Sequence, residues 1–267
     1  MAAGDITAKR TNYSDFPCNV FDGVDDYVEI PHAEAQLGAN LSNGFTISAW
    51  INARSIGETA GWIFGKSAGS TGTTGFYLHM GVNRISFRIN IGTVASSAVA
   101  SITYGTWYHV LVTISAAQLT NFYINGTLSG TANQDLVQTI STITGTTAVR
   151  IGNRPAATDR SFDGSIRNVK MWNRVLTTTE ITEEYNGQDH PTGKIHHFKL
   201  GGDYADYGSV GVTATNSGSV ANTTLPLRLQ TNTNQLNLAA ATDKIIALPV
   251  PGRNERFVII GANRAAA

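Results

Sequence analysis

GFTISAWIN, residues 44–52, places Phe45, Ile47 and Ile51 on one face of an extended chain. Mostly polar residues alternate with them, and an alternation of period two predicts a β-strand with one face in a core. A second stretch, WYHVLVTIS at residues 107–115, is apolar on both faces. A strand covered on both sides is typical of the centre of a sandwich. These two stretches therefore predict an all-β fold.

Shorter strand signals extend this pattern in both directions, from residue 18 to residue 172. They recur about every ten residues with turn residues between them, which predicts a sandwich or barrel rather than alternating strands and helices. Asn125-Gly126 is a strong signal for a two-residue hairpin turn. One short helix is predicted at residues 178–185, TTEITEEY, where threonine precedes an early glutamate.

The composition excludes several classes of protein. Nineteen basic and nineteen acidic residues cancel, so no net positive charge attracts nucleic acid. No apolar run approaches the length that spans a bilayer, so we expect no membrane insertion. Cys18 is the only cysteine, which excludes an intrachain disulfide and favours a buried apolar role. Residues 1–10 lack the apolar segment of a secretory signal, so we expect no export signal.

The composition changes near residues 186–191, where we place a domain boundary. Residues 1–190 are expected to form the sandwich, and residues 191–267 a small β-rich extension. Within the extension, residues 244–250 and 256–260 read as two short apolar strands. A segment of this size with few aromatics makes a marginal core alone, so we expect it to pack on the sandwich or on a neighbouring subunit. Deleting 194–267 is then expected to leave a folded monomer.

Six segments, in this order and spacing, resemble the laminin-G-like, concanavalin A-like lectin-glucanase superfamily from about residue 20 to residue 185. They are FDGVDDYVEIPH (21–32), GFTISAWINA (44–53), GTWYHVLVTIS (105–115), NFYINGTLSG (121–130), IGN (151–153) and FDGSIRNVKMWNRVLTTTEI (162–181). The resemblance implies a jelly-roll β-sandwich of two antiparallel sheets. It also implies core positions for Trp50, Trp107 and Trp172. The fold serves lectins, adhesion modules, glycosidases and virion proteins, so it does not fix the function.

Many relatives bind calcium near the first strand and the final motif, so the resemblance implies candidate ligands in both places. Hard divalent cations are held by several oxygens at once. Asp22, Asp25 and Asp26 lie within five residues, and Asp163 and Asn168 belong to the later motif. Asn168 stands where many relatives have an acid, which reduces the ligand charge. The alternative is that Asp22 and Asp163 serve their Asp-Gly turns.

The other candidate residues concern ligand binding. Trp62 lies in GETAGWIFG, outside the motifs that imply core tryptophans, and could contact a ligand. Arg154, Asp159 and Arg160 lie in NRPAATDRS, between two predicted strands. Loops at the rim of a sandwich often carry recognition, although an ordinary solvated loop is the alternative.

An enzyme is not expected. Glycoside hydrolysis needs two carboxylates at a defined separation. The strand with an E-x-D-x-x-E pattern, which concanavalin-like glucanases carry, is missing from the sequence. Phosphate-binding glycine loops are missing as well. Catalytic residues are therefore not assigned.

Two functions fit these observations. The first is a structural or adhesive protein on a virion surface, such as a phage decoration, head fibre or tail appendage. In that case residues 191–267 would bind other virion proteins or further copies of the chain in a homo-oligomer, through exposed strand edges. The alternative is a carbohydrate-binding, lectin-like module of a bacterial surface or secreted protein, with surface glycans as ligands and Ca²⁺ as a candidate cofactor.

Overall fold

The computed structural model describes residues 17–31, 37, 41–67, 75–89, 95–98, 101–117, 119–133, 147–155, 157–218, 220–223, 244–249 and 256–261. The chain divides into two compact units, residues 1–226 and 227–267. The first unit contains two antiparallel sheets, and the second contains a two-stranded hairpin.

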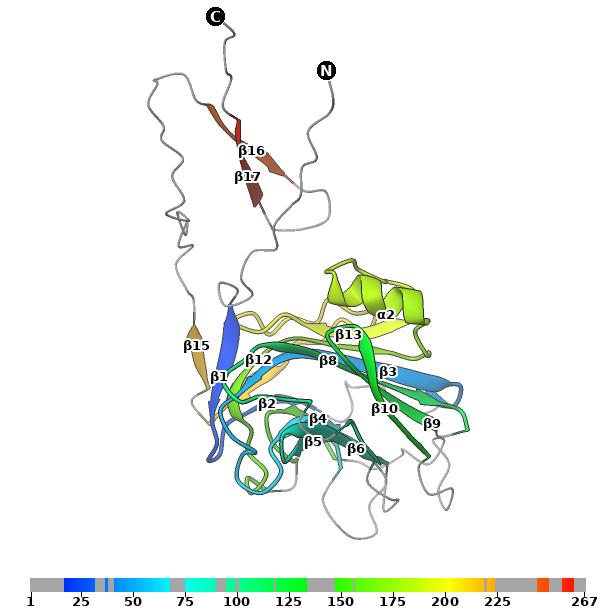
Figure 1. Cartoon of the computed structure of the whole chain (residues 1–267). Helices are drawn as coiled ribbons and strands as arrows, with labels where there is room; N and C mark the ends of the chain where they lie inside the picture. The colour runs from blue at the N-terminus through cyan, green and yellow to red at the C-terminus, as the bar shows by residue number, and fades with distance from the viewer. Residues whose placement is uncertain are drawn as a thin grey trace, which may run out of the picture. The chain divides into compact units, whose positions relative to one another are not determined.

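The eight-stranded sheet, here called sheet A, has the order β10-β9-β8-β3-β12-β1-β15, with β13 also paired to β12 (Figure 1). Its strands are β1 (Cys18–Asp22), β3 (Gly44–Ala53), β8 (Tyr108–Ser115), β9 (Leu119–Ile124), β10 (Thr127–Asn133), β12 (Asp163–Trp172), β13 (Lys194–Phe198) and β15 (Ala221–Thr223). The two stretches that predicted the fold, β3 and β8, are neighbours at its centre.

The seven-stranded sheet, here called sheet B, has the order β14-β2-β11-β4-β5-β6-β7. Its strands are β2 (Tyr27–Ile30), β4 (Trp62–Lys66), β5 (Phe76–Gly81), β6 (Arg84–Ile89), β7 (Ala95–Ser96), β11 (Val149–Ile151) and β14 (Thr215–Ser217). The predicted sandwich of two antiparallel sheets is thereby confirmed.

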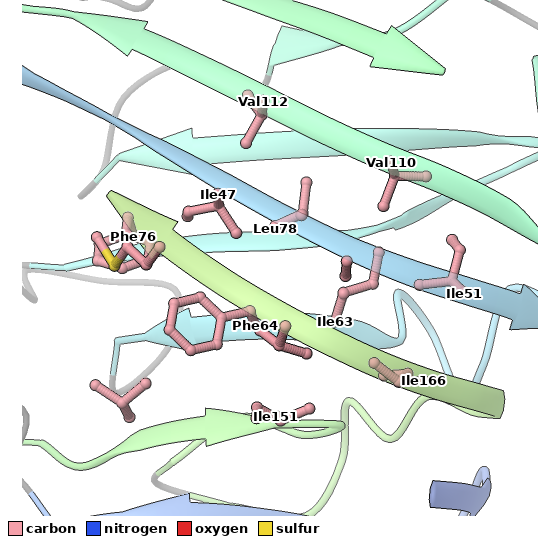
Figure 2. Close-up of a cluster of buried hydrophobic side chains, with 14 of the residues drawn as sticks. Ile47, Ile51, Ile63, Phe64, Phe76, Leu78, Val110, Val112, Ile151 and Ile166 are labelled. Carbon is pink, nitrogen blue, oxygen red and sulfur yellow. The ribbon is translucent and has the colours of Figure 1, made fainter. Parts of the chain in front are cut away.

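The main core lies between the two sheets. Side chains from β3, β8 and β12 of sheet A meet side chains from β4, β5 and β11 of sheet B (Figure 2). The residues labelled there are Ile47, Ile51, Ile63, Phe64, Phe76, Leu78, Val110, Val112, Ile151 and Ile166. All ten side chains are fully buried, which confirms the face predicted for β3.

The outer face of sheet A carries the helix α2 (Thr178–Tyr185), which lies over it in Figure 1. The helix begins as predicted at a threonine: the Thr177 side chain accepts the Glu180 N–H, and the Glu180 side chain accepts the Thr177 N–H. Beneath it lies a smaller apolar cluster, Leu111, Tyr123, Trp172, Leu176 and Ile181.

The tryptophans expected in the core occupy different places. Trp172 is fully buried below α2, and Trp50 is buried on the same outer face, where its ring stacks on Tyr185. Trp107 is only half-buried and immediately precedes β8. Trp50 and Trp172 therefore pack outside the main core between the sheets, because α2 covers a face that β-strand periodicity alone would expose.

The hairpin turn at Asn125-Gly126 is confirmed, because both residues have positive φ (52° and 77°) between β9 and β10. Asparagine and glycine tolerate this left-handed backbone at low cost, and two such residues form the type I′ turn that matches the twist of paired strands. Within the described residues, no helix is long and apolar enough to cross a membrane.

The expected boundary after residue 190 does not coincide with the division between the compact units, which falls after Pro226. The physical reason is strand pairing. β13 pairs with β12, β14 with β2 and β15 with β1, so these three strands belong to the two sheets of the sandwich. The second unit contains β16 (Lys244–Pro249) antiparallel to β17 (Arg256–Gly261), which confirms the two strands predicted there.

Candidate functional site

The acidic loop of residues 22–26 joins the two sheets, because Asp22 ends β1 of sheet A and Tyr27 begins β2 of sheet B. Gly23 has φ +84° and makes the turn that the Asp-Gly dipeptide predicts. The Asp22 carboxylate also accepts the N–H of Val24 at 2.8 Å. One carboxylate oxygen from each of Asp22, Asp25 and Asp26 lies within 4.8 Å of the others. The loop thus brings three of the predicted ligands together.

Asp26 is the unusual member of this group, because it is 98% buried, with 2% of its surface exposed. Its Oδ2 accepts the Asp22 N–H at 3.0 Å, while its Oδ1 is buried and has no hydrogen-bond partner. Burial raises the pKa of Asp26 to about 6, and the charges of Asp22 and Asp25 act in the same direction. A buried carboxylate oxygen without a partner beside two further carboxylates is a donor set suited to a hard divalent cation.

The two later candidates are not part of this group. Asp163 lies opposite Asp22 across β12 and β1, but its carboxylate binds the Arg54 side chain at 2.7 Å. Asn168 lies five residues further along β12, a distance of about 17 Å at about 3.4 Å per residue. There Asn168 has φ +48° in an irregular part of the pairing with β3, and its N–H donates to the backbone carbonyl of Lys199. Strand geometry therefore separates Asn168 from the acidic loop.

The outer face of sheet B is the second candidate region. The cross-strand pairs Arg88↔Tyr77, Tyr77↔Gly65, Gly65↔Arg150 and Arg150↔Glu29 place these residues in one row across five strands. Cross-strand partners share a face of the sheet. The row points away from the core, because the neighbours of Tyr77 in β5 are core residues. Among the described elements, the helix lies on sheet A and not on this face.

The buried Trp62 ring packs against Tyr77, a member of this row. The two rings stack, with centroids 4.2 Å apart and an angle of 11° between planes. A Cβ at Gly65 would lie 2.8 Å from the Trp62 ring, so the missing side chain makes room for it. Trp62 is 2% exposed and leaves almost no surface to a ligand, whereas Tyr77 is partly exposed. Of the two stacked rings, Tyr77 is thus the one that reaches the surface.

The loop of residues 153–161 lies beside Trp62. The Trp62 N–H donates to the Arg160 carbonyl at 2.9 Å. Asn153 is fully buried, and its Oδ1 accepts the N–H groups of Arg154 and Arg160 at 2.8 and 3.2 Å. These hydrogen bonds hold Arg154 and Arg160, two of the predicted ligand-binding residues, beside Trp62. The sequence does not predict that Trp62 and this loop are neighbours, because the contact depends on which strands pair.

The charged groups around this face bind one another. Arg154 donates to Asp159 at 2.8 Å, and the Asp159 side chain is 46% exposed. Arg150 donates to Glu29 at 2.7 Å and stacks over the Tyr27 ring at 3.6 Å. These interactions hold polar and aromatic groups in fixed positions, which lowers the entropy lost on binding.

His79 lies on the same face, opposite both Trp62 and Ser86 in the strand pairing. The pKa of His79 is lowered to about 4, chiefly by burial; a hydrogen bond with the Met80 carbonyl opposes the shift, and the charges of Arg88 and Arg160 add to it. The ring is neutral at physiological pH, and its Nε2 is buried without a hydrogen-bond partner. His79 and the Tyr77 ring lie 5.2 Å apart, so they form one aromatic group.

Sequence reasoning missed Tyr77, Arg88 and Arg150. The signal was the alternation in FYLHMG, which puts Tyr77 and His79 on the face opposite the apolar side chains. Among the described residues, the other buried carboxylates have structural partners: Glu184 binds Lys170 at 2.7 Å, and Asp206 binds His196 at 2.8 Å.

Comparison with known proteins supports the fold. A candidate carbohydrate binding protein from Bacteroides ovatus is 17% identical with a TM-score of 0.57, over 79% of this chain and 60% of that one. The IT-sialidase CBM40 of Ruminococcus gnavus is 17% identical with a TM-score of 0.51, over 63% of this chain and 96% of that one. A NanB sialidase variant from Streptococcus pneumoniae is 17% identical with a TM-score of 0.50, over 62% of this chain and 27% of that one.

At these identities the similarities show the fold alone, and the chain spans about three fifths of the Bacteroides ovatus protein. No curated protein matches the sequence. The family model described as the Concanavalin A-like lectin/glucanases superfamily matches residues 22–182, from the acidic loop through most of α2. The match covers more than half of the 267 residues, and the chain belongs to this superfamily.

Proposed function

We propose that this protein is a carbohydrate-binding module without enzymatic activity, and that it binds glycans on the outer face of sheet B. The observation that carries the proposal is the partly exposed Tyr77 ring, held flat on Trp62 in one row with Arg88 and Arg150. Sugars are bound by an apolar ring face together with fixed hydrogen-bond groups, and this row offers both.

Carbohydrate binding is favoured over display on a virion. Two of the proteins with this fold are named as a candidate carbohydrate binding protein and a sialidase CBM40. The neutral net charge does not favour polyanionic partners such as nucleic acid. An extracellular or cell-surface location goes with this function, because glycans are displayed there.

The proposal includes a Ca²⁺ ion in the acidic loop. Asp22, Asp25 and Asp26 would hold it, and the buried Asp26 Oδ1 would gain the partner that it lacks. Ca²⁺ takes six to eight oxygen ligands, roughly, so water or carbonyl groups would complete the shell. The ion would neutralise three neighbouring carboxylates and fix the connection between the two sheets. Its part is structural, since the loop contributes no side chain to the row on sheet B.

The test is a glycan array on the full chain, followed by calorimetry with the strongest ligand. Tyr77→Ala should weaken binding about tenfold, which corresponds to about 1.4 kcal/mol. Tyr207→Ala is the matched control, because this tyrosine is 47% exposed but lies in the segment that follows β13. Equal affinity of the Tyr77 and Tyr207 variants would contradict the proposed face, and no binding to any glycan by the unmodified chain would overturn carbohydrate binding.

A further inference from the structure

The segment formed by β14, Gly218, Val220 and β15, here called the arm, follows the acidic loop across the edge of the sandwich. β15 pairs with β1 just before the loop, with Val20 opposite Ala221. β14 pairs with β2 just after it, with Tyr27 opposite Ser217. The chain therefore passes between the two sheets twice at the same edge. The arm lies outside the family match, which ends at residue 182.

Gly218 is the point of contact between the arm and the loop. Its φ is +79°, and a Cβ on it would lie 2.8 Å from the Asp26 Cα, 2.9 Å from the Asp25 carbonyl oxygen and 3.0 Å from Asp26 Oδ1. This last atom is the buried oxygen without a hydrogen-bond partner. A side chain does not fit there, so the backbone of the arm closes directly over the buried carboxylate.

Several contacts hold the arm in this position besides its pairing with β1 and β2. Thr215 Oγ1 donates to the Glu29 carbonyl at 3.4 Å, and the Tyr204 hydroxyl donates to Asn222 Oδ1 at 2.9 Å. Asn216 Nδ2 donates to the Val220 carbonyl at 3.2 Å, across the point where the arm changes sheets. Val220 and Ala214 are each 3% exposed and belong to the main core. The two strands of the arm are only three residues long, however, and both lie at sheet edges. The arm is thus attached through two short edge pairings and a few side-chain contacts, and its Gly218 lies directly against Asp26.

We propose that a divalent cation in the acidic loop and the arm stabilise each other, so that cation binding controls the attachment of the arm. The inference rests on the cation site of the proposed function. Without a cation, the exposed carboxylates of Asp22 and Asp25 repel the buried Asp26 carboxylate, which lies beneath Gly218. With a cation, the charge is neutralised and the loop is held in the form that Gly218 covers. Coupling of this kind is reciprocal, so closure of the arm must strengthen cation binding by the same factor.

The coupling has a consequence for the rest of the chain. The second unit, residues 227–267, is joined to the sandwich through the residues that follow β15. A cation that fixes the arm therefore fixes the point from which the second unit extends. Removal of the cation should loosen β14 and β15 at the sheet edges and leave the central strands paired, because those strands lie away from the arm in the strand order.

The first experiment is hydrogen exchange by mass spectrometry on the full chain, with Ca²⁺ and with a chelator. Ca²⁺ should slow exchange in peptides that cover residues 215–223 by at least about tenfold, the effect of about 1.4 kcal/mol of coupling. Peptides from β9 and β10, at the opposite edge of sheet A, should not change. The readout does not depend on glycan binding.

The second experiment measures Ca²⁺ affinity by calorimetry for Gly218→Ala and Gly211→Ala. Gly211 is the matched control, because its φ is +70° and its Cβ would have no neighbour within 4 Å. Both variants suffer the strain of a left-handed alanine, but only Gly218→Ala disturbs the loop. We expect Gly218→Ala to lose at least about tenfold in Ca²⁺ affinity and Gly211→Ala to match the unmodified chain.

The outcomes separate the two proposals. Ca²⁺ binding without a change in exchange at residues 215–223, or with equal affinity in both glycine variants, overturns the coupling and leaves the cation site standing. No Ca²⁺ binding by the unmodified chain overturns both the cation site and the coupling, while glycan binding is judged separately on Tyr77. If Gly218→Ala does not fold, exchange on the unmodified chain decides alone.

Discussion

The rings of Trp62 and Tyr77 lie face to face, 4.2 Å apart, yet only Tyr77 is partly exposed. The two rings therefore have different roles, one in packing and one at the surface. Trp62 contributes buried area and fixes the orientation of the ring above it. Tyr77 presents that ring at the surface of sheet B.

Replacement of each ring should separate these roles. Trp62→Ala should lower the free energy of unfolding by about 3–5 kcal/mol, as for other buried large residues. Tyr77→Ala should cost clearly less, because part of its ring is exposed. Urea unfolding of both variants measures the difference. A Trp62→Ala variant as stable as the unmodified chain would show that this ring does not support the sheet.

The buried ion pair between Lys170 and Glu184 joins α2 to sheet A, with a distance of 2.7 Å and side chains that are 10% and 3% exposed. Glu184→Ala leaves the Lys170 charge without its nearest partner, and we expect a loss of about 3–5 kcal/mol in stability. Glu183 is the control: its side chain is 37% exposed, so Glu183→Ala should cost at most about 1 kcal/mol. Chemical denaturation measures both, and equal costs would mean that the pair is not a buried link.

Asp26 makes the stability of the chain depend on pH. Its pKa is raised from 3.8 to about 6 in the folded protein, chiefly by burial. The folded state therefore binds this proton more tightly than the unfolded state does. In a chelator, the stabilising contribution is complete below the unfolded pKa and is lost as the pH rises through about 6.

Melting temperatures in a chelator, from about pH 4 to about pH 7, test this dependence. Asp26→Asn should gain stability relative to the unmodified chain as the pH rises, because it has no charge to bury. In Ca²⁺ at neutral pH the order should reverse, since the cation favours the charged carboxylate. A difference between the two proteins that does not change with pH would exclude a titrating Asp26.

Truncation tests the division of the chain. A protein that ends at residue 226 keeps every strand of both sheets and should unfold in one cooperative transition. A protein that ends at residue 193 loses β13, β14 and β15 and should be less stable, because it exposes core residues that these strands cover. If the second unit carries assembly, the full chain should be oligomeric and the 1–226 chain monomeric in analytical ultracentrifugation. Equal stability of the two truncated proteins, or a monomeric full chain, would contradict these expectations.

Local patterns determined much of the architecture. The alternation in residues 44–52, the apolar stretch at 107–115 and the Asn125-Gly126 turn each specify a strand or hairpin, because side-chain direction and turn geometry depend on a few neighbouring residues. The threonine and glutamate at the start of α2 specify its cap for the same reason. The clustering of three aspartates was also readable, since they share one short loop.

Only the tertiary structure decided which distant residues meet. The strand register placed Asn168 far from the acidic loop and brought the loop of residues 153–161 beside Trp62. It also added β13, β14 and β15 to the sandwich and set Gly218 against Asp26. The physical reason is that a β-sheet is held by hydrogen bonds between segments remote in sequence. Periodicity therefore fixes the face on which a residue lies, whereas its neighbours on that face depend on which strands pair and in which register.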